Sequence, residues 1–226
     1  MIRSLIKSPF PVKSLLIAEN RLGKFSAFQE ELSDKPIYIA AQDVMDQIAG
    51  FAIHRGMLAL GDRGKGRAAT SLLDGAPPDA VVVVAVGIGN HDNMGAIFRN
   101  AAAFGAHAVL LDETSCDPLY RKALRVSVGA ALTVPFARVA ASNLPALLAA
   151  HGFAALALTP AGEARLDSLR PSGRVALLLG SEGPGLPPSL LAASQRVRID
   201  MQPDFDSLNV ATAGAIALHH LRAVAG

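Results

Sequence analysis

The stretch RVALLLGSEGPG, residues 174–185, decides the fold of this chain. It joins a largely apolar run, Arg174–Leu179, to a loop that contains Gly180, Gly183 and Gly185. A continuous apolar run of this kind is typical of a strand buried on both faces, as in a parallel sheet. Glycine lets a loop backbone approach a ligand closely. The stretch therefore predicts a parallel strand that ends at a ligand-binding loop, because open α/β sheets bind ligands at the carboxyl ends of their strands.

Two further segments have the same form, with small or amide-bearing residues after an apolar run. In the first, Asn93-Met94-Gly95 follows the run Val81–Val86 and leads to Arg99. In the second, Ser207-Leu208-Asn209-Val210 follows a predicted strand, Val197–Ile199. One such segment is a weak signal, because glycine-rich turns are common. Three in this order, each after an apolar run, form a specific pattern.

The chain alternates between apolar runs and helical patterns, with a turn-rich boundary at residues 75–79. The predicted strands are Ser14–Ala18, Ile37–Ala40, Gly56–Leu60, Val81–Val86, Ala108–Leu111, Leu132–Phe136, Ala154–Leu158, Arg174–Leu179 and Val197–Ile199. The predicted helices are Asp43–Ile48, Asn93–Phe104, Arg121–Ser127, Leu144–His151, Pro187–Ala193 and Asn209–Ala223. This order predicts a small α/β domain over residues 1–75 and, over residues 76–226, a parallel sheet with helices on both faces.

The composition indicates a globular protein. Of 226 residues, 51% are hydrophobic and 18% are charged, the opposite of the balance that disorder requires. A net charge of +2 does not by itself indicate nucleic-acid binding and leaves a local basic surface open. Cys116 is the only cysteine, so an intramolecular disulfide is excluded, which suits a reducing cytosol. No apolar run approaches the roughly 20 residues that span a bilayer, so we expect a soluble cytoplasmic protein with no membrane partner.

Asn93 and Arg99 are predicted to lie on one helix that begins beside a strand end. Asp92 or Asn93 is expected to cap this helix with its side-chain oxygen. Gly95 lies four residues before Arg99 on much the same helix face, so its missing side chain is expected to leave a hollow beside the guanidinium. A surface arginine on a capped helix is the other interpretation of this segment.

Several other kinds of site are disfavoured. The loop at residues 180–185 lacks the Gly-Lys-Ser/Thr ending of a phosphate-binding P-loop, and Gly87-Ile88-Gly89-Asn90 lacks the third glycine of a dinucleotide site. No His, Cys or carboxylate has a convincing metal-ligand spacing, so His219 and His220 are expected at the surface or an interface, and no metal is predicted. Purely structural interpretations of the other two segments are a plain turn at residues 180–185 and a helix cap at Ser207.

Together, the three segments resemble the motifs of the SpoU (TrmH-type) RNA 2′-O-ribose methyltransferases, a branch of the SPOUT superfamily. The resemblance is strong from Val81 to the C-terminus and weak over Ser14–Gly61. It implies transfer of a methyl group from S-adenosyl-L-methionine (AdoMet) to a ribose 2′-hydroxyl in structured RNA, either rRNA or tRNA. It also implies a C-terminal deep trefoil knot and a homodimer. The alternative is a non-catalytic RNA-binding protein that retains the fold, against which the intact motif set argues.

The resemblance implies roles for residues of all three segments. The catalytic positions are Arg99, Asn93, Glu182, Ser207 and Asn209. The donor-binding positions are Gly180, Gly185, Ile199, Met201 and Leu208, joined by Leu158 and Thr159, which end a strand beside the presumed pocket. The candidates for RNA phosphates are Arg121, Lys122 and Arg125, for which a solvated helix face is an equally good interpretation.

Free arginine is a poor general base, because its pKa lies above about 12. We therefore expect Arg99 to hold a substrate phosphate by a bidentate contact and to polarise the 2′-hydroxyl, whose proton passes to the phosphate or to a developing contact. One departure concerns Asp200, which stands where the family commonly has Pro. The change removes a restricted φ angle and adds a charge beside the donor site.

The N-terminal region, Ser14–Gly61, resembles the ribosomal-protein-like domain that precedes the catalytic domain in many family members, including its stretch Phe51–Gly56. Those domains usually have more residues before their first strand than this chain has before Ser14, so we expect an incomplete N-terminal unit. Whether it binds RNA stays open. The basic stretch Gly61–Arg67 is interpreted as a linker in preference to a track for a phosphate backbone.

Overall fold

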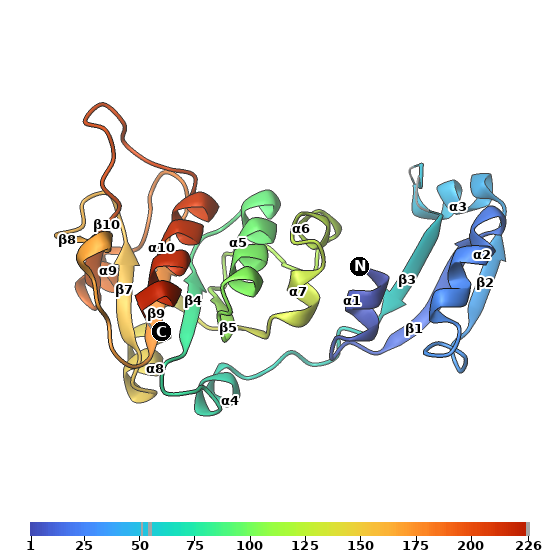
Figure 1. The fold of residues 1–226 in the computed structure, drawn as a ribbon, viewed down its shortest axis with the longest axis horizontal. Coiled ribbons are helices and arrows are strands. Elements are labelled where there is room, and N and C mark those ends of the chain that lie inside the picture. Colours follow the sequence, from blue (N-terminus) through green and yellow to red (C-terminus); the bar gives the residue numbers. More distant parts are fainter. Residues whose placement is uncertain (51, 54–55, 225–226) are drawn as a thin grey trace. The chain divides into compact units, whose positions relative to one another are not determined.

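The computed structural model of the chain describes residues 1–50, 52–53 and 56–224. The chain divides into two compact units, Met1–Lys65 and Gly66–Gly226 (Figure 1). The division falls within the basic stretch that was expected to be a linker. It precedes the predicted boundary at residues 75–79, because helix α4 (Ala69–Asp74) buries Leu72 and Leu73 in the core of the second unit.

The first unit contains a three-stranded sheet in the order β2-β1-β3. Strand β1 (Val12–Ala18) pairs in parallel with β2 (Ile37–Ala40) and antiparallel with β3 (Met57–Gly61). Its helices are α1 (Ile2–Ile6), α2 (Leu22–Phe25), α3 (Gln42–Ala49) and two 3₁₀ turns, Glu19–Arg21 and Ser26–Phe28. Within the stretch compared with ribosomal-protein-like domains, Phe51, His54 and Arg55 lie outside the described residues.

The second unit contains a seven-stranded sheet in the order β6-β5-β4-β9-β7-β10-β8. Its strands are β4 (Val81–Ala85), β5 (Ala108–Leu111), β6 (Phe136–Arg138), β7 (Ala154–Leu158), β8 (Ala164–Arg165), β9 (Val175–Leu179) and β10 (Gln195–Arg198). Every pairing in it is parallel. The predicted parallel α/β sheet is therefore confirmed.

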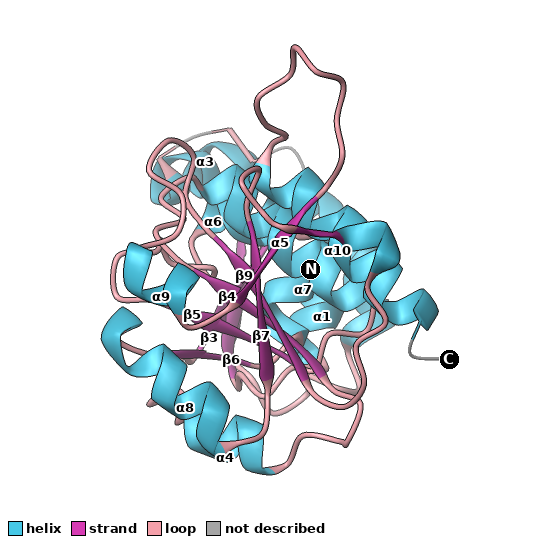
Figure 2. Cartoon of the chain, turned by 90° about the vertical axis from the view of Figure 1, so that its left-hand side faces the viewer, coloured by secondary structure: helices cyan, strands magenta, loops and turns pink. Residues whose placement is uncertain are grey.

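Helices cover both faces of this sheet (Figure 2). One face packs against α5 (His91–Ala103), α6 (Arg121–Val126), α7 (Ala130–Thr133) and α10 (Val210–Val224). The other face packs against α4, α8 (Leu144–Ala150) and α9 (Pro188–Ala192). Two 3₁₀ turns, Ala141–Asn143 and Leu166–Ser168, complete the unit.

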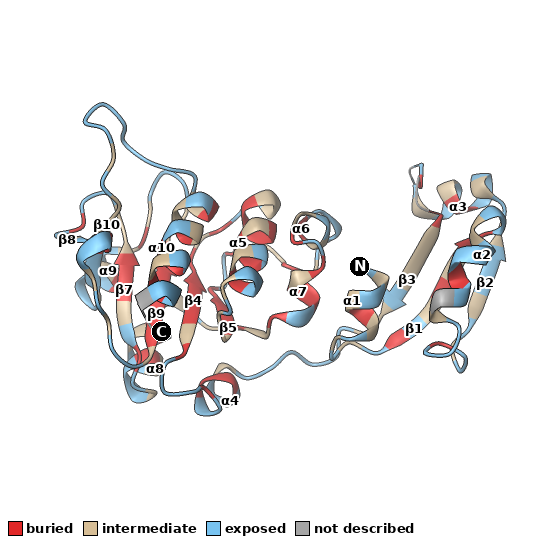
Figure 3. Cartoon of the chain, in the orientation of Figure 1, coloured by how far each residue is buried: buried red, intermediate tan, exposed pale blue. Residues whose placement is uncertain are grey.

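Side chains alternate between these two cores along the central strands. In β4, Val83 packs with Phe98 of α5 on one face, whereas Val84 packs with Leu73 of α4 on the other. Figure 3 shows the resulting burial along β4 and β9. Burial on both faces explains why these strands are apolar at every position.

The prediction of a strand over Leu132–Phe136 was wrong. Residues Ala130–Thr133 form helix α7, and the strand β6 begins only at Phe136. Gly129, at φ +86°, starts α7 after the preceding helix. A short apolar run does not distinguish a buried strand from a buried helical turn, so hydrophobicity alone misled the assignment.

Candidate active site at the carboxyl ends of the strands

The strand order reverses beside β4. From β4 the chain crosses one face through α5 to β5, whereas β9, the other neighbour of β4, leads to the loop of residues 180–185 and to α9 on the opposite face. The start of α5 and this glycine loop therefore flank the carboxyl edge at a reversal point. Open α/β sheets bind their ligands at such points.

Three polar side chains, one from each motif segment, meet at this edge. Asn93 Nδ2 donates a hydrogen bond to Glu182 Oε1 at 2.8 Å. Asn209 Nδ2 donates to Asn93 Oδ1 at 2.8 Å and to Glu182 Oε1 at 3.1 Å. Asn93 is only 7% exposed, so its amide requires such partners. We call these three residues the amide–carboxylate cluster; they connect parts of the chain up to 116 residues apart.

Helix starts hold both asparagines of the cluster. Asn93 lies in the first turn of α5, whose cap is Asn90, with Asn90 Oδ1 accepting the Asp92 N–H at 2.8 Å. The prediction that Asp92 or Asn93 caps this helix was therefore wrong. Asn209 Oδ1 accepts the N–H groups of Ala211 and Thr212 at 3.0 and 3.2 Å, which leaves its amide nitrogen for the cluster.

The alternative interpretation of Ser207 was that it caps this helix. The residue that caps α10 is Asn209. Ser207 lies two residues before the cap, is exposed, and lines the cavity described below.

The glycine loop places Glu182 by a tight reversal. Ser181 and Gly185 form an isolated antiparallel bridge, and the Gly185 N–H donates to the Ser181 carbonyl oxygen at 3.2 Å. A Cβ atom on Gly180 would lie 2.5 Å from both the Gly185 carbonyl carbon and the Leu186 nitrogen. Only glycine fits where two stretches of backbone cross this closely. The loop therefore differs from a plain turn, because its backbone crossing requires glycine at position 180.

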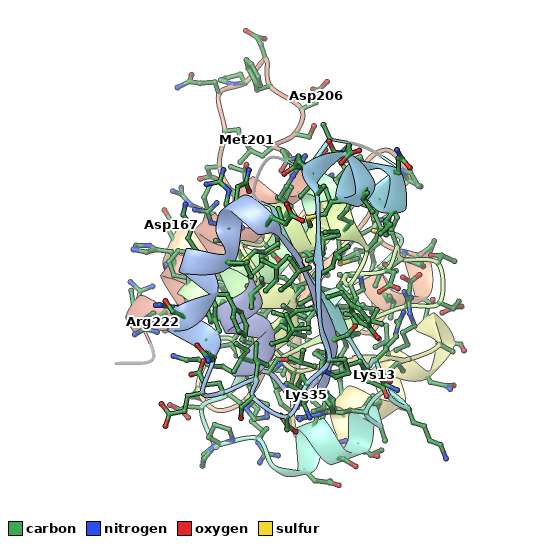
Figure 4. The ribbon with its side chains drawn as sticks, turned by 90° about the vertical axis from the view of Figure 1, so that its right-hand side faces the viewer. Lys13, Lys35, Asp167, Met201, Asp206 and Arg222 are labelled. Atoms are coloured by element: carbon green, nitrogen blue, oxygen red, sulfur yellow. The ribbon has the colours of Figure 1, made fainter. Side chains whose placement is uncertain are left out.

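A cavity of about 400 Å³ adjoins the cluster at the carboxyl ends of β7, β9 and β10. Its lining contains all seven predicted donor-binding residues, namely Leu158, Thr159, Gly180, Gly185, Ile199, Met201 and Leu208. It also contains Glu182 and Ser207. Met201 and Asp206 reach it from the loop after β10, which projects beyond the strand ends (Figure 4).

The cavity has the volume and chemistry of a small-molecule site. Sites for such ligands are commonly about 300–1,000 Å³, mainly apolar, with a few polar groups that fix orientation. Here Leu158, Leu179 and Leu186 supply apolar walls, and Glu182 and Ser207 supply polar groups. Within the described part of the chain, no group of three or more His, Cys, Asp or Glu side chains is arranged to hold a metal ion. None of the described helices combines the length and the apolar character needed to cross a membrane.

Arg99 does not join the cluster within one chain. It is exposed and is not among the residues that line the cavity. At 1.5 Å of rise per residue, the step from Asn93 to Arg99 is about 9 Å along α5. The predicted hollow at Gly95 is also absent, because a Cβ there would lie 2.7 Å from both the Ala123 oxygen and the Val126 Cβ of α6. Gly95 thus allows α5 and α6 to pack closely.

The three basic residues predicted to contact RNA, Arg121, Lys122 and Arg125, are all exposed on α6. Lys122 Nζ forms an ion pair with Asp92 Oδ2 at 2.6 Å. Asp92 immediately precedes Asn93, so this pair ties α6 to the start of α5. The basic side chains therefore belong to a helix that packs beside the amide–carboxylate cluster.

The sequence analysis missed Asp112, which follows β5 and is 2% exposed. Its carboxylate accepts the N–H groups of Gly87 and Ser115 at 3.0 and 2.9 Å and also the Thr114 hydroxyl. Burial raises the pKa of Asp112. Hydrogen bonds from Ser115, Thr114 and Gly87 lower it by a larger amount, so the pKa stays below its usual range. The ionised Asp112 thus fixes the turn that leads from β4 into α5.

The geometry agrees with comparisons to known proteins. The model of the SpoU rRNA Methylase family matches residues 80–219. A Mycobacterium tuberculosis protein described as an uncharacterized tRNA/rRNA methyltransferase is 39% identical over an alignment that covers 97% of this chain and 77% of that protein. The chain belongs to the SpoU rRNA methylase family. The resemblance seen in the three motif segments is therefore confirmed.

Solved SpoU structures share this architecture. The SpoU methyltransferase AviRb from Streptomyces viridochromogenes, in complex with AdoMet, aligns with a TM-score of 0.82 at 22% identity over 98% of this chain and 86% of AviRb. A structure of an RNA 2′-O ribose methyltransferase aligns with a TM-score of 0.80 at 26% identity over 99% of this chain and 85% of that one. Both structures therefore align with nearly the whole length of this chain.

Proposed function

We propose that the chain transfers a methyl group from AdoMet to a ribose 2′-hydroxyl of rRNA or tRNA. The observation that carries this proposal is the amide–carboxylate cluster of Asn93, Glu182 and Asn209 at the rim of the cavity. Membership of an RNA methyltransferase family supports the reaction class. Likeness to an RNA 2′-O ribose methyltransferase at 26% identity supports the ribose hydroxyl as acceptor.

The cavity suits AdoMet as the methyl donor. Its volume of about 400 Å³ matches a nucleoside that carries an amino-acid side arm. The backbone of Ile199 and Leu208 would hold the adenine, and Leu158 and Thr159 would contact the donor. The Gly180–Gly185 loop, which contains Glu182, would line the same pocket. The AdoMet-bound AviRb structure supports this choice of donor.

When bound, AdoMet supplies an electrophilic methyl group on a sulfonium sulfur. The residues of the chain act mainly by positioning, which accounts for large accelerations in two-substrate reactions. Glu182 Oε1 accepts a hydrogen bond from each asparagine amide, which holds the three side chains in one arrangement at the rim of the cavity. Arg99 holds a phosphate of the RNA and polarises the 2′-hydroxyl, whose proton passes to that phosphate.

Arg99 serves this site from a second copy of the chain. Within one chain it is exposed and does not line the cavity, and a homodimer would bring the guanidinium of the second copy to the rim. The resemblance to SpoU enzymes supports this dimer, a deep trefoil knot formed by the C-terminal segment, action in the cytoplasm, and RNA contacts through Arg121, Lys122 and Arg125.

The test is to incubate the purified protein with unmodified total RNA and AdoMet labelled on its methyl group. Ribose 2′-O-methylation protects the adjacent phosphodiester from alkali, so the label is expected in alkali-resistant dinucleotides. Label in mononucleotides, which would carry a methyl group on the base, would overturn the ribose assignment. RNA binding without any AdoMet binding would favour the non-catalytic alternative.

A further inference from the structure

Asp200 occupies an unusual place beside the proposed donor cavity. It lies between Ile199 and Met201, which both line the cavity, in the segment that leaves β10. Its own side chain is directed to two arginines: Oδ2 lies 2.9 Å from Arg165 Nε, and Oδ1 accepts from Arg198 Nε at 3.0 Å. One carboxylate therefore bridges β8 and β10.

One of these arginines, Arg198, also binds the turn between β7 and β8. Arg198 Nη1 donates to the carbonyl oxygens of Gly162 and Glu163, each at 2.9 Å. Gly162 lies directly on β10, since a Cβ atom there would be 2.3 Å from the Val197 carbonyl carbon. The turn that starts at the cavity residues Thr159 and Pro160 is thus tied to the strand that ends at Ile199.

Two walls of the cavity are therefore joined through Arg198, which pairs with Asp200 and binds the turn after β7. One wall is Leu158–Pro160 at the end of β7, and the other is Ile199–Met201 after β10. A proline at this position would restrict the backbone through its ring. Here the backbone is free of that restriction, and the carboxylate supplies a connection between the walls instead.

We propose that Asp200 is a positioning residue for the methyl donor: its contacts with Arg165 and Arg198 hold the two walls at the spacing that AdoMet requires. This inference rests on the proposed function, because it takes AdoMet as the occupant of the cavity. The contacts are partly exposed, with 43% of the Asp200 side chain accessible. Exposed ion pairs are individually weak and are screened by salt, so the effect on affinity is moderate and depends on ionic strength.

The chain offers a matched control in Asp167. Asp167 also pairs with Arg165, with Oδ1 and Oδ2 at 3.1 and 2.7 Å from its guanidinium nitrogens, but it neither lines the cavity nor adjoins a residue that does. Asp167→Asn removes the same charge from the same arginine and leaves the contact of Asp200 with Arg198 intact. Comparison with this variant distinguishes the effect of losing a surface charge from the effect of losing the contact that positions the cavity walls.

The experiment is calorimetric titration of AdoMet into the full chain and its variants at about 50 and 500 mM NaCl. Asp200→Asn is expected to raise the Kd about three- to tenfold at low salt and to flatten its salt dependence. Asp167→Asn is expected to stay within about twofold of the wild type, and Asp200→Glu, which keeps the carboxylate, to recover most of the affinity.

Thermal unfolding of every variant establishes that the fold is retained. Equal affinity of the wild type and Asp200→Asn, or equal weakening by Asp200→Asn and Asp167→Asn, would overturn the positioning role while leaving the proposed function in place. No AdoMet binding by the wild type would overturn the proposed function, and the role of Asp200 with it.

Discussion

The donor cavity and the surface that carries the candidate RNA-contacting residues are built in different ways. All seven predicted donor-binding residues come from strand ends and adjoining loops of one chain, and they line one cavity. The cationic residues Arg99, Arg121, Lys122 and Arg125 are exposed on α5 and α6 and do not line that cavity. A single chain thus assembles a pocket for a small donor but leaves its cations on an open surface.

This difference follows from the size of the two ligands. A donor of a few tens of atoms fits within a crevice at one sheet edge. An RNA extends well beyond the edge of one sheet, and its phosphates are met by exposed cations. The proposed donor side is therefore complete in one chain, and the RNA side is proposed to require a second copy to supply Arg99.

The largest expected effect is that of a substitution at Arg99, which should reduce methyl transfer without weakening donor binding. Arg99→Lys keeps the charge but loses the planar bidentate fork, so methyl transfer is expected to fall by about 10²–10³-fold, while the Kd for AdoMet changes less than twofold. Single-turnover kinetics and calorimetry measure the two quantities. Arg170→Lys, at an exposed arginine that binds the carbonyl oxygens of Asp167 and Leu169, serves as the control. Full turnover by Arg99→Lys would contradict the assigned role.

The next effect concerns the donor side alone. A methyl group at Gly180 would overlap the Gly185–Leu186 backbone, and such overpacking costs about 1–3 kcal/mol. Gly180→Ala is therefore expected to raise the Kd for AdoMet by about 10- to 100-fold and to lower the unfolding temperature. Gly89→Ala is the matched control, since nothing lies within 4 Å of its added Cβ. Unchanged binding by Gly180→Ala would remove the glycine loop from the donor site.

A smaller effect on stability is expected at Asp112. Folding lowers its pKa, so the ionised carboxylate stabilises the native state above about pH 3.9, and this contribution disappears as the pH falls through the lower pKa of the folded state. Asp112→Asn is expected to reduce the unfolding free energy by about 1–3 kcal/mol at pH 7. The gap to the wild type should narrow in urea titrations below about pH 3.9. A gap that is constant down to pH 2 would contradict this assignment.

The smallest effect decides between the two interpretations of the α6 cations. Lys122→Ala breaks an exposed pair with Asp92, which is worth less than about 1 kcal/mol, so stability should hardly change. If Lys122 contacts a phosphate, RNA binding weakens and the slope of log Kd against log salt falls by about 1. RNA titrations over a range of salt concentrations measure that slope. Binding identical to the wild type would favour a solvated helix face.

Local sequence patterns were sufficient to predict most of the second unit. The strands Ala108–Leu111 and Ala154–Leu158 have the predicted bounds, because each is an apolar run between clear breakers. The meeting of Asn93, Glu182 and Asn209 also followed, since each lies in a segment that follows a strand and returns to the same sheet edge. The features that the sequence did not predict depend on tertiary contacts. Strand β8 has two residues and exists through its pairing with β10.

The errors have physical causes of the same kind. The helix α4 was placed in the N-terminal domain because the Pro-rich turn after it looked like a boundary, whereas the burial of Leu73 assigns it to the second unit. Gly95 suggested a hollow because its neighbour across the helix interface, Val126, is not visible in a helical wheel. Asp112 was missed because its partners Gly87 and Ser115 are recognisable only once β4 and β5 are paired.

A crystal structure of the chain with S-adenosylhomocysteine, the demethylated form of the donor, tests the central claim most directly. The account predicts this ligand in the cavity between Leu158–Pro160 and Ser207–Val210, with its sulfur facing the amide–carboxylate cluster and the partner's Arg99 on the same side. A ligand bound elsewhere, or an Arg99 guanidinium remote from the sulfur in every copy, would contradict it.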